Sequence, residues 1–322
     1  MKILVASPRG FCAGVNMAIA ALDRALELFP LPIYVFHEIV HNKHVVEGFR
    51  ARGVIFVDEV EEVPNGGTLV YSAHGVSPQV RERASARHLN VVDATCPLVT
   101  KVHSEAVRFA RQGHEMVLIG HAGHDEVIGT IGEAPGHIRL VQDVEDVDAL
   151  ELGSTPSLAY LSQTTLSVDD AGAIINRLRA RFPAIVAPPS ADICYASQNR
   201  QEAVRLIASE VDAFFVIGSQ NSSNSRRLAE IAREQGIPAY LIDDTSDIDP
   251  AWLQGVASIG VTAGASAPED LVDECLTYFQ TRFDGVIEGR ELRTEDMHFQ
   301  LPVELRRAAR ASVQDASSAA GA

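Results

Sequence analysis

Apolar and polar positions follow one pattern along the chain, and this pattern occurs three times. Each occurrence begins with an amphipathic helix, continues with an apolar strand, and passes through a polar loop into another helix. The apolar strands are predicted at residues 33–36, 116–119 and 214–217. The helix after each polar loop ends near a glycine, which is Gly53, Gly136 or Gly236. A short strand then closes on an aspartate, which is Asp58, Asp143 or Asp243.

The second half of each unit also repeats, as a strand, a loop of small residues and a further helix. The loops read S-A-H-G-V-S-P from Ser72, S-Q-T-T-L-S from Ser162 and T-A-G-A-S-A-P from Thr262. In the first two units another strand is predicted after that helix, and it leads into a cysteine. The third unit has no such cysteine, but the N-terminal strand at residues 2–6 leads into Cys12 and has no unit of its own. This strand can therefore supply the missing edge of the third unit.

Alternation of strands and helices predicts the α/β class, with parallel sheets whose ligand loops lie at the carboxyl ends of the strands. We expect three similar α/β domains in a pseudo-threefold, cloverleaf arrangement. The predicted domains are residues 13–96, residues 97–193, and residues 1–12 together with 194–282. Residues 283–322 form a C-terminal extension, which becomes rich in Ala, Arg and Ser from about Val303 without an apolar period. We expect its end to be a frayed tail.

The chain has 322 residues and a formal net charge of −16. This charge argues against non-specific binding to nucleic acid or to acidic membranes, because both require a basic surface. The apolar runs are strand-sized and too short to span a membrane, and the N-terminus lacks the layout of a signal peptide. We therefore expect a cytoplasmic protein that binds neither membrane nor nucleic acid. An anionic substrate would require a locally positive site.

The four cysteines are poor candidates for disulfides in a reducing compartment. Cys275 lies in the helical run L-V-D-E-C-L-T-Y-F and is interpreted as a packing residue. Cys12, Cys96 and Cys194 instead lie between a strand and a helix whose dipole favours a thiolate. Three thiolates suit an iron–sulfur cluster or zinc, although zinc sites usually take two ligands from a Cys-x-x-Cys pair that this chain lacks. In a four-iron cluster, three ligands leave one iron open to substrate.

Polar side chains occupy matching loops of the three units. Imidazoles stand in the first two units, at His41, His74 and His124. The third unit carries Ser222, Ser223, Asn224 and Ser266. These serines and the asparagine are helix-capping residues, and capping alone would explain them. Because hydroxyls, amides and free N–H groups at a helix start also bind phosphate, the sharper hypothesis is one diphosphate held by all three units.

Three residues, Glu126, His124 and Thr164, are candidates for catalysis. Glu126 follows His124 by two residues, and burial beside a metal site would raise its pKa and let it pass protons. A carboxylate in the first turn of a helix can instead serve simply to complement the helix dipole. We interpret Asp125 in this way. Thr164 in S-Q-T-T-L could orient a proton path, or Thr164 and Thr165 could be ordinary caps.

Taken together, these motifs resemble the 4-hydroxy-3-methylbut-2-enyl diphosphate reductase (LytB) family almost from end to end. The resemblance rests on R-G-F-C-A-G-V at Cys12, H-N at His41, S-A-H-G at His74, D-A-T-C-P at Cys96, G-H-x-E ending at Glu126, S-Q-T-T at Thr164 and N-S-S-N-S at Ser222. The family implies three α/β domains around a central [4Fe-4S] cluster with three cysteine ligands and an open apical iron. It also implies the last step of the methylerythritol phosphate route to isoprenoids.

The resemblance implies roles for the candidate residues. The substrate diphosphate would be bound by His41, His74, His124, Ser222, Ser223, Asn224 and Ser266. The allylic hydroxyl would lie on the open iron near Thr164, and Glu126 would govern protonation to isopentenyl and dimethylallyl diphosphate. No G-x-G-x-x-G fingerprint is present, so a separate ferredoxin or flavodoxin is the expected electron donor. Two other functions remain open: a cluster-bearing sensor or scaffold that binds a phosphate metabolite, and a zinc-dependent hydrolase of phosphorylated substrates.

Overall fold

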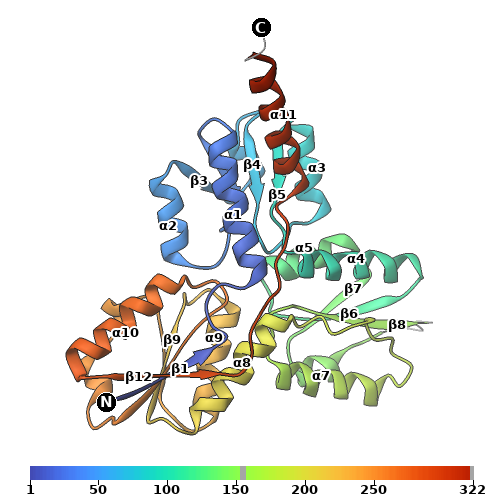
Figure 1. Cartoon of the computed structure of the whole chain (residues 1–322). Coiled ribbons are helices and arrows are strands. Elements are labelled where there is room, and N and C mark those ends of the chain that lie inside the picture. The colour runs from blue at the N-terminus through green and yellow to red at the C-terminus, as the bar shows by residue number, and fades with distance from the viewer. Residues whose placement is uncertain (153–156, 320–322) are drawn as a thin grey trace.

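The computed structural model describes residues 1–152 and 157–319 of the chain. Over these residues the strands form three separate sheets, and all the strand pairs are parallel. Figure 1 shows the sheets and their helices as three lobes that meet near the middle of the molecule. The structure therefore has the predicted class, with three similar α/β domains in a cloverleaf.

The first sheet has the strand order β3-β2-β4-β5. Its strands are β2 (Ile33–Phe36), β3 (Val54–Val57), β4 (Thr68–Tyr71) and β5 (Asn90–Asp93). Helices α1 (Ala13–Leu28), α2 (Lys43–Ala51) and α3 (Pro78–Ala86) accompany them. Every residue of β4 is buried, as expected for a parallel strand with helices on both faces.

The second sheet has the order β7-β6-β8. Its strands are β6 (Glu115–Ile119), β7 (Ile138–Val141) and β8 (Leu158–Ser162), and its helices are α4 (Pro97–Arg111), α5 (Asp125–Glu133), α6 (Val144–Ala149) and α7 (Val168–Arg181). The strand predicted before Cys194 does not form, and residues 182–193 contribute only one isolated bridge, between Val186 and Ala159. Pro188 and Pro189 follow that bridge, and proline has no N–H to continue the ladder.

The third sheet has the order β10-β9-β11-β1-β12. Its strands are β1 (Lys2–Ser7), β9 (Ala213–Ile217), β10 (Ala239–Ile242), β11 (Ser258–Ala263) and β12 (Val286–Glu291), and its helices are α8 (Tyr195–Ala208), α9 (Ser223–Glu234) and α10 (Glu269–Phe283). Strand β1 pairs with β11, so that Ile3 lies opposite Ile259. The N-terminal strand therefore belongs to the third unit as predicted, but it lies between β11 and β12 and not at the edge, because β12 extends the sheet beyond it.

The C-terminal segment differs from its prediction. Strand β12, which lies in the expected extension, pairs with β1 and forms an edge of the third sheet. The chain then crosses to the first lobe and forms helix α11 (Val303–Ala319), which contacts α1 and β5 (Figure 1). Leu305 is 1% exposed and packs with Leu301 in the core of the first domain. The prediction of a frayed tail from Val303 was therefore wrong for this helix. Leu301, just before the helix, and Leu305, within it, anchor the helix on the first domain, although its sequence has no extended apolar period.

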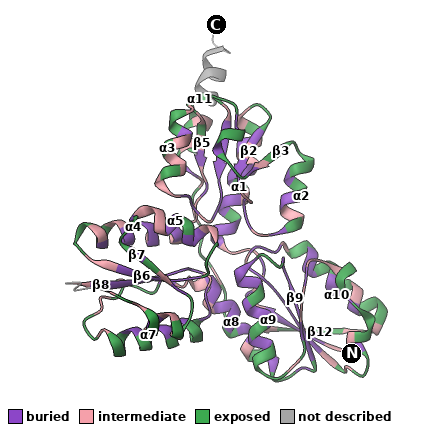
Figure 2. Cartoon of the chain, turned by 180° about the vertical axis from the view of Figure 1, so that it is seen from behind, coloured by how far each residue is buried: buried purple, intermediate pink, exposed green. Residues whose placement is uncertain are grey.

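The fold points the polar loops toward the centre of the molecule. Strands are largely buried and the outer faces of the helices are exposed, as Figure 2 shows. In each sheet the strand order reverses between two adjacent strands, which are β2 and β4, β6 and β8, or β9 and β11. Loops at such a reversal leave a crevice beyond the carboxyl ends of the strands. Among the described helices, none combines the length and the apolar character needed to cross a membrane.

Candidate functional site

Three cysteines occupy equivalent places at the centre of the structure. Cys12, Cys96 and Cys194 are the N-cap residues of α1, α4 and α8. The backbone N–H of each cysteine donates a hydrogen bond to a carbonyl in the small-residue loop of one unit. The acceptors are Ala265 at 3.2 Å for Cys12, Ala73 at 3.0 Å for Cys96 and Thr164 at 3.0 Å for Cys194. The threefold repeat of the sequence is thus reproduced in the hydrogen bonds that hold the cysteines.

The three thiols lie close to one another. A Cβ atom added to Gly14 would lie 2.6 Å from Sγ of Cys96 and 3.8 Å from Sγ of Cys12. Burial raises the pKa of Cys96 to about 12 and that of Cys194 to about 11, and the charge of Cys12 adds to both effects. Neutral thiols at these positions therefore require a cationic group before all three can ionise together. The donor set fits a soft metal centre.

The fourth cysteine lies elsewhere. Cys275 is on α10, has no exposed surface and packs in the core of the third domain. Burial raises the pKa of its thiol to about 12. The prediction that it is a packing residue is confirmed.

One cavity at the meeting of the three lobes collects the predicted site residues. Its lining includes Cys12, His41, His74, Cys96, His124, Glu126, Thr164, Cys194, Ser222, Ser223, Asn224 and Ser266. They come from loops that are far apart in the sequence. The cavity is lined by thiols, imidazoles, hydroxyls and an amide, which are ligands for a metal centre and for an anion.

The imidazoles form a compact group. The rings of His41 and His74 stack with centroids 4.0 Å apart, and the edge of His124 meets them at 5.4 and 5.8 Å. Burial, together with the neighbouring histidines, lowers the pKa of His74 well below its ordinary value and that of His124 to about 4. The rings of His74 and His124 are therefore neutral in the free protein, and an arriving anion would favour their protonation.

The third domain contributes hydroxyl and amide groups. Ser222 caps α9 through a hydrogen bond from the N–H of Ser225 at 3.3 Å, and Ser266 donates to the carbonyl of His41 at 2.8 Å. Oδ1 of Asn224 accepts from the N–H of Ala265 at 2.8 Å. Its Nδ2 is buried and has no hydrogen-bond partner among the described residues. A buried donor of this kind is available to an anionic ligand.

Glu126 lines the same cavity. Its carboxyl group accepts hydrogen bonds from the N–H of Thr164 at 2.6 Å and from Oγ1 of Thr164 at 3.0 Å. The residue is 2% exposed, and burial raises its pKa to about 7 in spite of these hydrogen bonds. Glu126 can therefore hold a proton near neutral pH.

The structure adds residues that the sequence analysis missed or assigned differently. Nδ1 of His41 lies 3.0 Å from Glu38, and Nδ1 of His37 lies 2.7 Å from Asp125. Asp125, interpreted above as a partner of the helix dipole, therefore also contacts the first domain. The signal was present in F-H-E, which directly follows a predicted strand as the other polar loops do.

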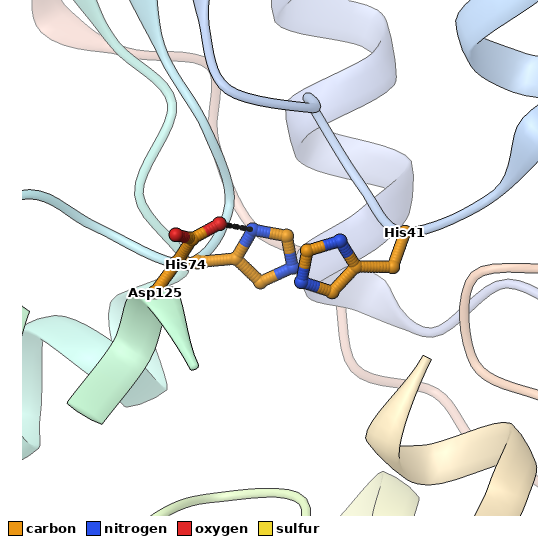
Figure 3. A group of neighbouring side chains, drawn as sticks. All are labelled: His41, His74 and Asp125. Carbon is orange, nitrogen blue, oxygen red and sulfur yellow. Dashed lines mark ion pairs between the residues drawn. The ribbon is translucent and has the colours of Figure 1, made fainter. Parts of the chain in front are cut away.

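One group of side chains in this region has the composition of a metal site. Ligand atoms of His41, His74 and Asp125 all lie within 4.8 Å of one another. Figure 3 shows the three side chains. Two imidazoles and a carboxylate can hold zinc. The hydrogen bond from His37 already occupies one oxygen of the Asp125 carboxylate. This arrangement favours a hydrogen-bond network at the anion pocket.

Comparison with known proteins agrees with this geometry. Residues 3–280 match the family described as LytB protein. A relative from Rhodopirellula baltica, named 4-hydroxy-3-methylbut-2-enyl diphosphate reductase, is 56% identical over 95% of this chain and 96% of its own length. A relative of the same name from Azoarcus is 54% identical over 95% of this chain and 98% of its own length.

Two solved structures are similar as well. The diphosphate reductase from Plasmodium falciparum has a TM-score of 0.94 and 38% identity, covering 97% of this chain and 98% of its own. A second structure, described as (E)-4-hydroxy-3-methyl-but-2-enyl diphosphate reductase and as the terminal enzyme of the non-mevalonate pathway, has a TM-score of 0.62 and 31% identity. It covers 87% of this chain and 99% of its own. By sequence and by fold, this chain belongs to the LytB family of 4-hydroxy-3-methylbut-2-enyl diphosphate reductases.

Proposed function

We propose that this chain reduces (E)-4-hydroxy-3-methylbut-2-enyl diphosphate to isopentenyl diphosphate and dimethylallyl diphosphate, the terminal step of the non-mevalonate pathway. The observation that carries the proposal is the single cavity in which three domains bring together three cysteines, three histidines and a buried glutamate. The name shared by the relatives supports the same substrate. The reaction consumes two electrons and two protons, breaks the allylic carbon–oxygen bond, and releases the hydroxyl as water.

Cys12, Cys96 and Cys194 would hold one [4Fe-4S] cluster and leave its apical iron open. Two features support the fit. The missing Cβ of Gly14 leaves space beside two of the thiols, and the raised pKa values of Cys96 and Cys194 call for a cationic partner. When bound, such a cluster supplies electrons and offers its open iron to the substrate hydroxyl as a Lewis acid.

The diphosphate would be bound by side chains of all three domains: His41, His74, His124, Ser222, Ser223, Asn224 and Ser266. The unpartnered Nδ2 of Asn224 is a donor that a phosphate oxygen would satisfy. Helix α9 begins at Ser223, so its first N–H groups and the positive end of its dipole lie at the cavity. The local field is thus favourable to an anion even though the whole chain is strongly negative.

Glu126 would govern delivery of protons to the allylic unit. A carboxyl group with a pKa of about 7 is protonated often enough at neutral pH to act as an acid and is readily reloaded. Both hydrogen bonds from Thr164 fix the direction of this carboxyl group. Protonation at either end of the allylic unit accounts for the two products.

The electrons would come from a separate ferredoxin or flavodoxin. The sequence has no nucleotide or flavin fingerprint of the G-x-G-x-x-G type, which favours an external donor. We also propose a cytoplasmic location, because a reducing compartment keeps three thiols available for a cluster.

The first test is metal analysis and electron paramagnetic resonance of the protein purified without oxygen. About four iron and four sulfide per chain are expected for one such cluster. Stoichiometric zinc without iron would refute the cluster. Binding of the substrate without turnover, in the presence of a chemical reductant, would favour a sensor over an enzyme.

The second test concerns the acid. Glu126→Gln keeps the shape of the side chain and one acceptor for Thr164 but cannot release a proton, so we expect the cluster and substrate binding to remain and turnover to fall by roughly 10²-fold or more. Glu82→Gln, on the exposed face of α3, is the matched control and should turn over as the wild type does. Normal turnover by Glu126→Gln would exclude the proposed role.

A further inference from the structure

Asp125 joins the second domain to the first at the edge of the anion pocket. It lies in the first turn of α5, and its Oδ1 accepts a hydrogen bond from Nδ1 of His37 at 2.7 Å. Its Oδ2 lies 3.9 Å from Nδ1 of His74. Both histidines belong to the first domain. A carboxylate from one domain therefore lies beside imidazoles of another, and Figure 3 shows Asp125 together with His74 and His41.

The backbone at His37 is arranged to make this contact. His37 has a φ of +56°, in the left-handed region, which costs a residue other than glycine about 1 kcal/mol. Its ring stacks on Phe36 with centroids 4.1 Å apart. The hydrogen bond to Asp125 raises the pKa of His37 above its ordinary value. Burial would raise the pKa of Asp125, but the hydrogen bond and charge of His37 outweigh it, and this pKa is lowered. The carboxylate is therefore ionised.

His74 needs such a partner when an anion arrives. Its neighbours are the imidazoles of His41, His124 and His37 and the hydroxyl of Ser72, whose Oγ lies 3.3 Å from Nδ1 of His74. Burial among them keeps the ring neutral in the free protein. A neutral ring has one N–H, so it cannot donate at Nδ1 and to a phosphate oxygen at Nε2 together. With both nitrogens protonated it can, provided that a negative charge lies near Nδ1. Asp125 places a carboxylate oxygen 3.9 Å away.

His41 repeats this arrangement with a different domain. Nδ1 of His41 lies 3.0 Å from Oε2 of Glu38, and the same oxygen accepts a hydrogen bond from Nδ2 of Asn221 at 2.8 Å. Asn221 belongs to the third domain. Each stacked imidazole thus has a carboxylate near its Nδ1, in hydrogen-bond distance for His41 and at 3.9 Å for His74, and each carboxylate links two domains. The pattern ties the state of the imidazoles to the contact between domains.

We propose that Asp125 is a positioning residue that stabilises His74 as an imidazolium when a diphosphate binds. It does so across the boundary between the first two domains. The pocket then takes up a proton together with its anion, and it does so fully only with the domains in contact. The inference rests on the proposed function for the identity of the ligand. It makes no use of electron transfer, so its test needs no turnover.

The test uses the anaerobic holoenzyme and inorganic diphosphate as the probe. Titration calorimetry in buffers of different ionisation enthalpy gives the number of protons taken up on binding. All variants are compared at one pH, so that protonation of the diphosphate itself contributes equally to each. We expect the wild type to take up close to one proton more than Asp125→Asn, and Asp125→Asn to bind diphosphate roughly tenfold more weakly, as for one pKa unit at His74. Asp125→Glu should restore part of both.

Controls separate this role from a structural one. Asp270→Asn removes an exposed first-turn carboxylate from α10 and should change neither quantity. His37→Gln attacks the same contact from the first domain, and its effect on proton uptake should not add to that of Asp125→Asn. In turnover, the KM of Asp125→Asn should rise while kcat changes little.

Three outcomes would overturn the inference. The first is unchanged proton uptake and affinity in Asp125→Asn and His37→Gln, with the cluster absorbance of both intact. The second is a rise in KM that Asp125→Glu does not reduce at all. The third is stoichiometric binding of Zn²⁺ that Asp125→Asn abolishes while diphosphate affinity stays the same, which would mark His41, His74 and Asp125 as a metal site. If wild-type protein binds diphosphate with proton uptake but does not reduce the substrate, the proposed function fails and this inference stands.

Discussion

A buried arginine connects two of the cysteine loops, and removing its counter-ion should loosen the proposed cluster site. Arg200 on α8 has a side chain that is only 1% exposed. Its guanidinium donates to the carbonyl of Gly10 at 3.1 and 2.8 Å and to that of Ala196 at 3.0 Å. Gly10 lies two residues before one cysteine of the site, and Ala196 lies two residues after another. Both carboxylate oxygens of Glu295, at 3.1 and 3.2 Å, balance the charge.

The size of the effect follows from this geometry. Breaking a buried ion pair by removing one partner usually costs 3–5 kcal/mol, because the remaining charge stays buried. In Glu295→Ala, Arg200 would keep its hydrogen bonds to backbone carbonyls. The Glu295 side chain is 13% exposed, so water can partly replace its carboxylate. We therefore expect a loss of about 3 kcal/mol in the free energy of unfolding for Glu295→Ala. Glu295→Gln keeps one acceptor and should lose about 1–2 kcal/mol.

Urea unfolding of the anaerobic protein measures this loss, and the rate of iron release to a chelator measures the effect on the site. Glu295→Ala should release iron faster than the wild type, because the loops that carry the cysteines are less firmly held. Asp296→Ala is the matched control, since this exposed neighbour should change stability by less than about 0.5 kcal/mol. A Glu295→Ala protein as stable as Asp296→Ala, with unchanged iron release, would refute the reasoning.

Three further predictions concern other parts of the structure. In the protein freed of its cluster, Glu126 has a folded pKa of about 7 and an ordinary value of 4.5, so its ionisation destabilises the fold as pH rises through this interval. Relative to the wild type, Glu126→Gln should gain up to roughly 3 kcal/mol in the free energy of unfolding between pH 4 and pH 8. Gly14→Ala places a Cβ 2.6 Å from Sγ of Cys96 and should lose most of its bound iron. Leu305→Ala should cost about 2–3 kcal/mol in urea unfolding by leaving a cavity between α11 and the first domain.

Each of these has its own control. If the difference in free energy of unfolding between Glu126→Gln and the wild type were the same at every pH, the raised pKa of Glu126 would be contradicted. Gly172→Ala, in α7, meets no atom within 4 Å and should keep the iron that Gly14→Ala loses. Val303→Ala removes a side chain from a residue that is 40% exposed, and an equal loss in Val303→Ala and Leu305→Ala would mean that α11 is not anchored by burial.

Much of the fold followed from the order of elements in the sequence. Apolar runs at residues 33–36, 116–119 and 214–217 became the buried strands β2, β6 and β9, because parallel strands covered on both faces must be continuously apolar. The unpartnered strand at residues 2–6 was assigned to the third unit, where β1 is found. The strand predicted before Cys194 failed because consecutive prolines cannot donate to a ladder, which the apolar pattern alone does not record.

The site was predicted as a set of residue types, and the structure showed which partners complete it. Local motifs singled out Cys12, His41 and Glu126, since each such motif lies at the carboxyl end of a strand and at the start of a helix. The partners of these residues come from elsewhere in the chain. Asp125 contacts His37 across 88 positions, and Glu295 contacts Arg200 across 95.

The sequence by itself therefore determined the three units, the residues with reactive groups, and the family to which the chain belongs. Tertiary structure alone decided the distances and the protonation of the groups. Hydrophobic periodicity and turn chemistry act between near neighbours and are written in the order of residues. A pKa depends instead on burial and on charges within a few ångströms, whatever their separation along the chain. Glu126, His74 and Asp125 acquire their chemistry only when three domains meet.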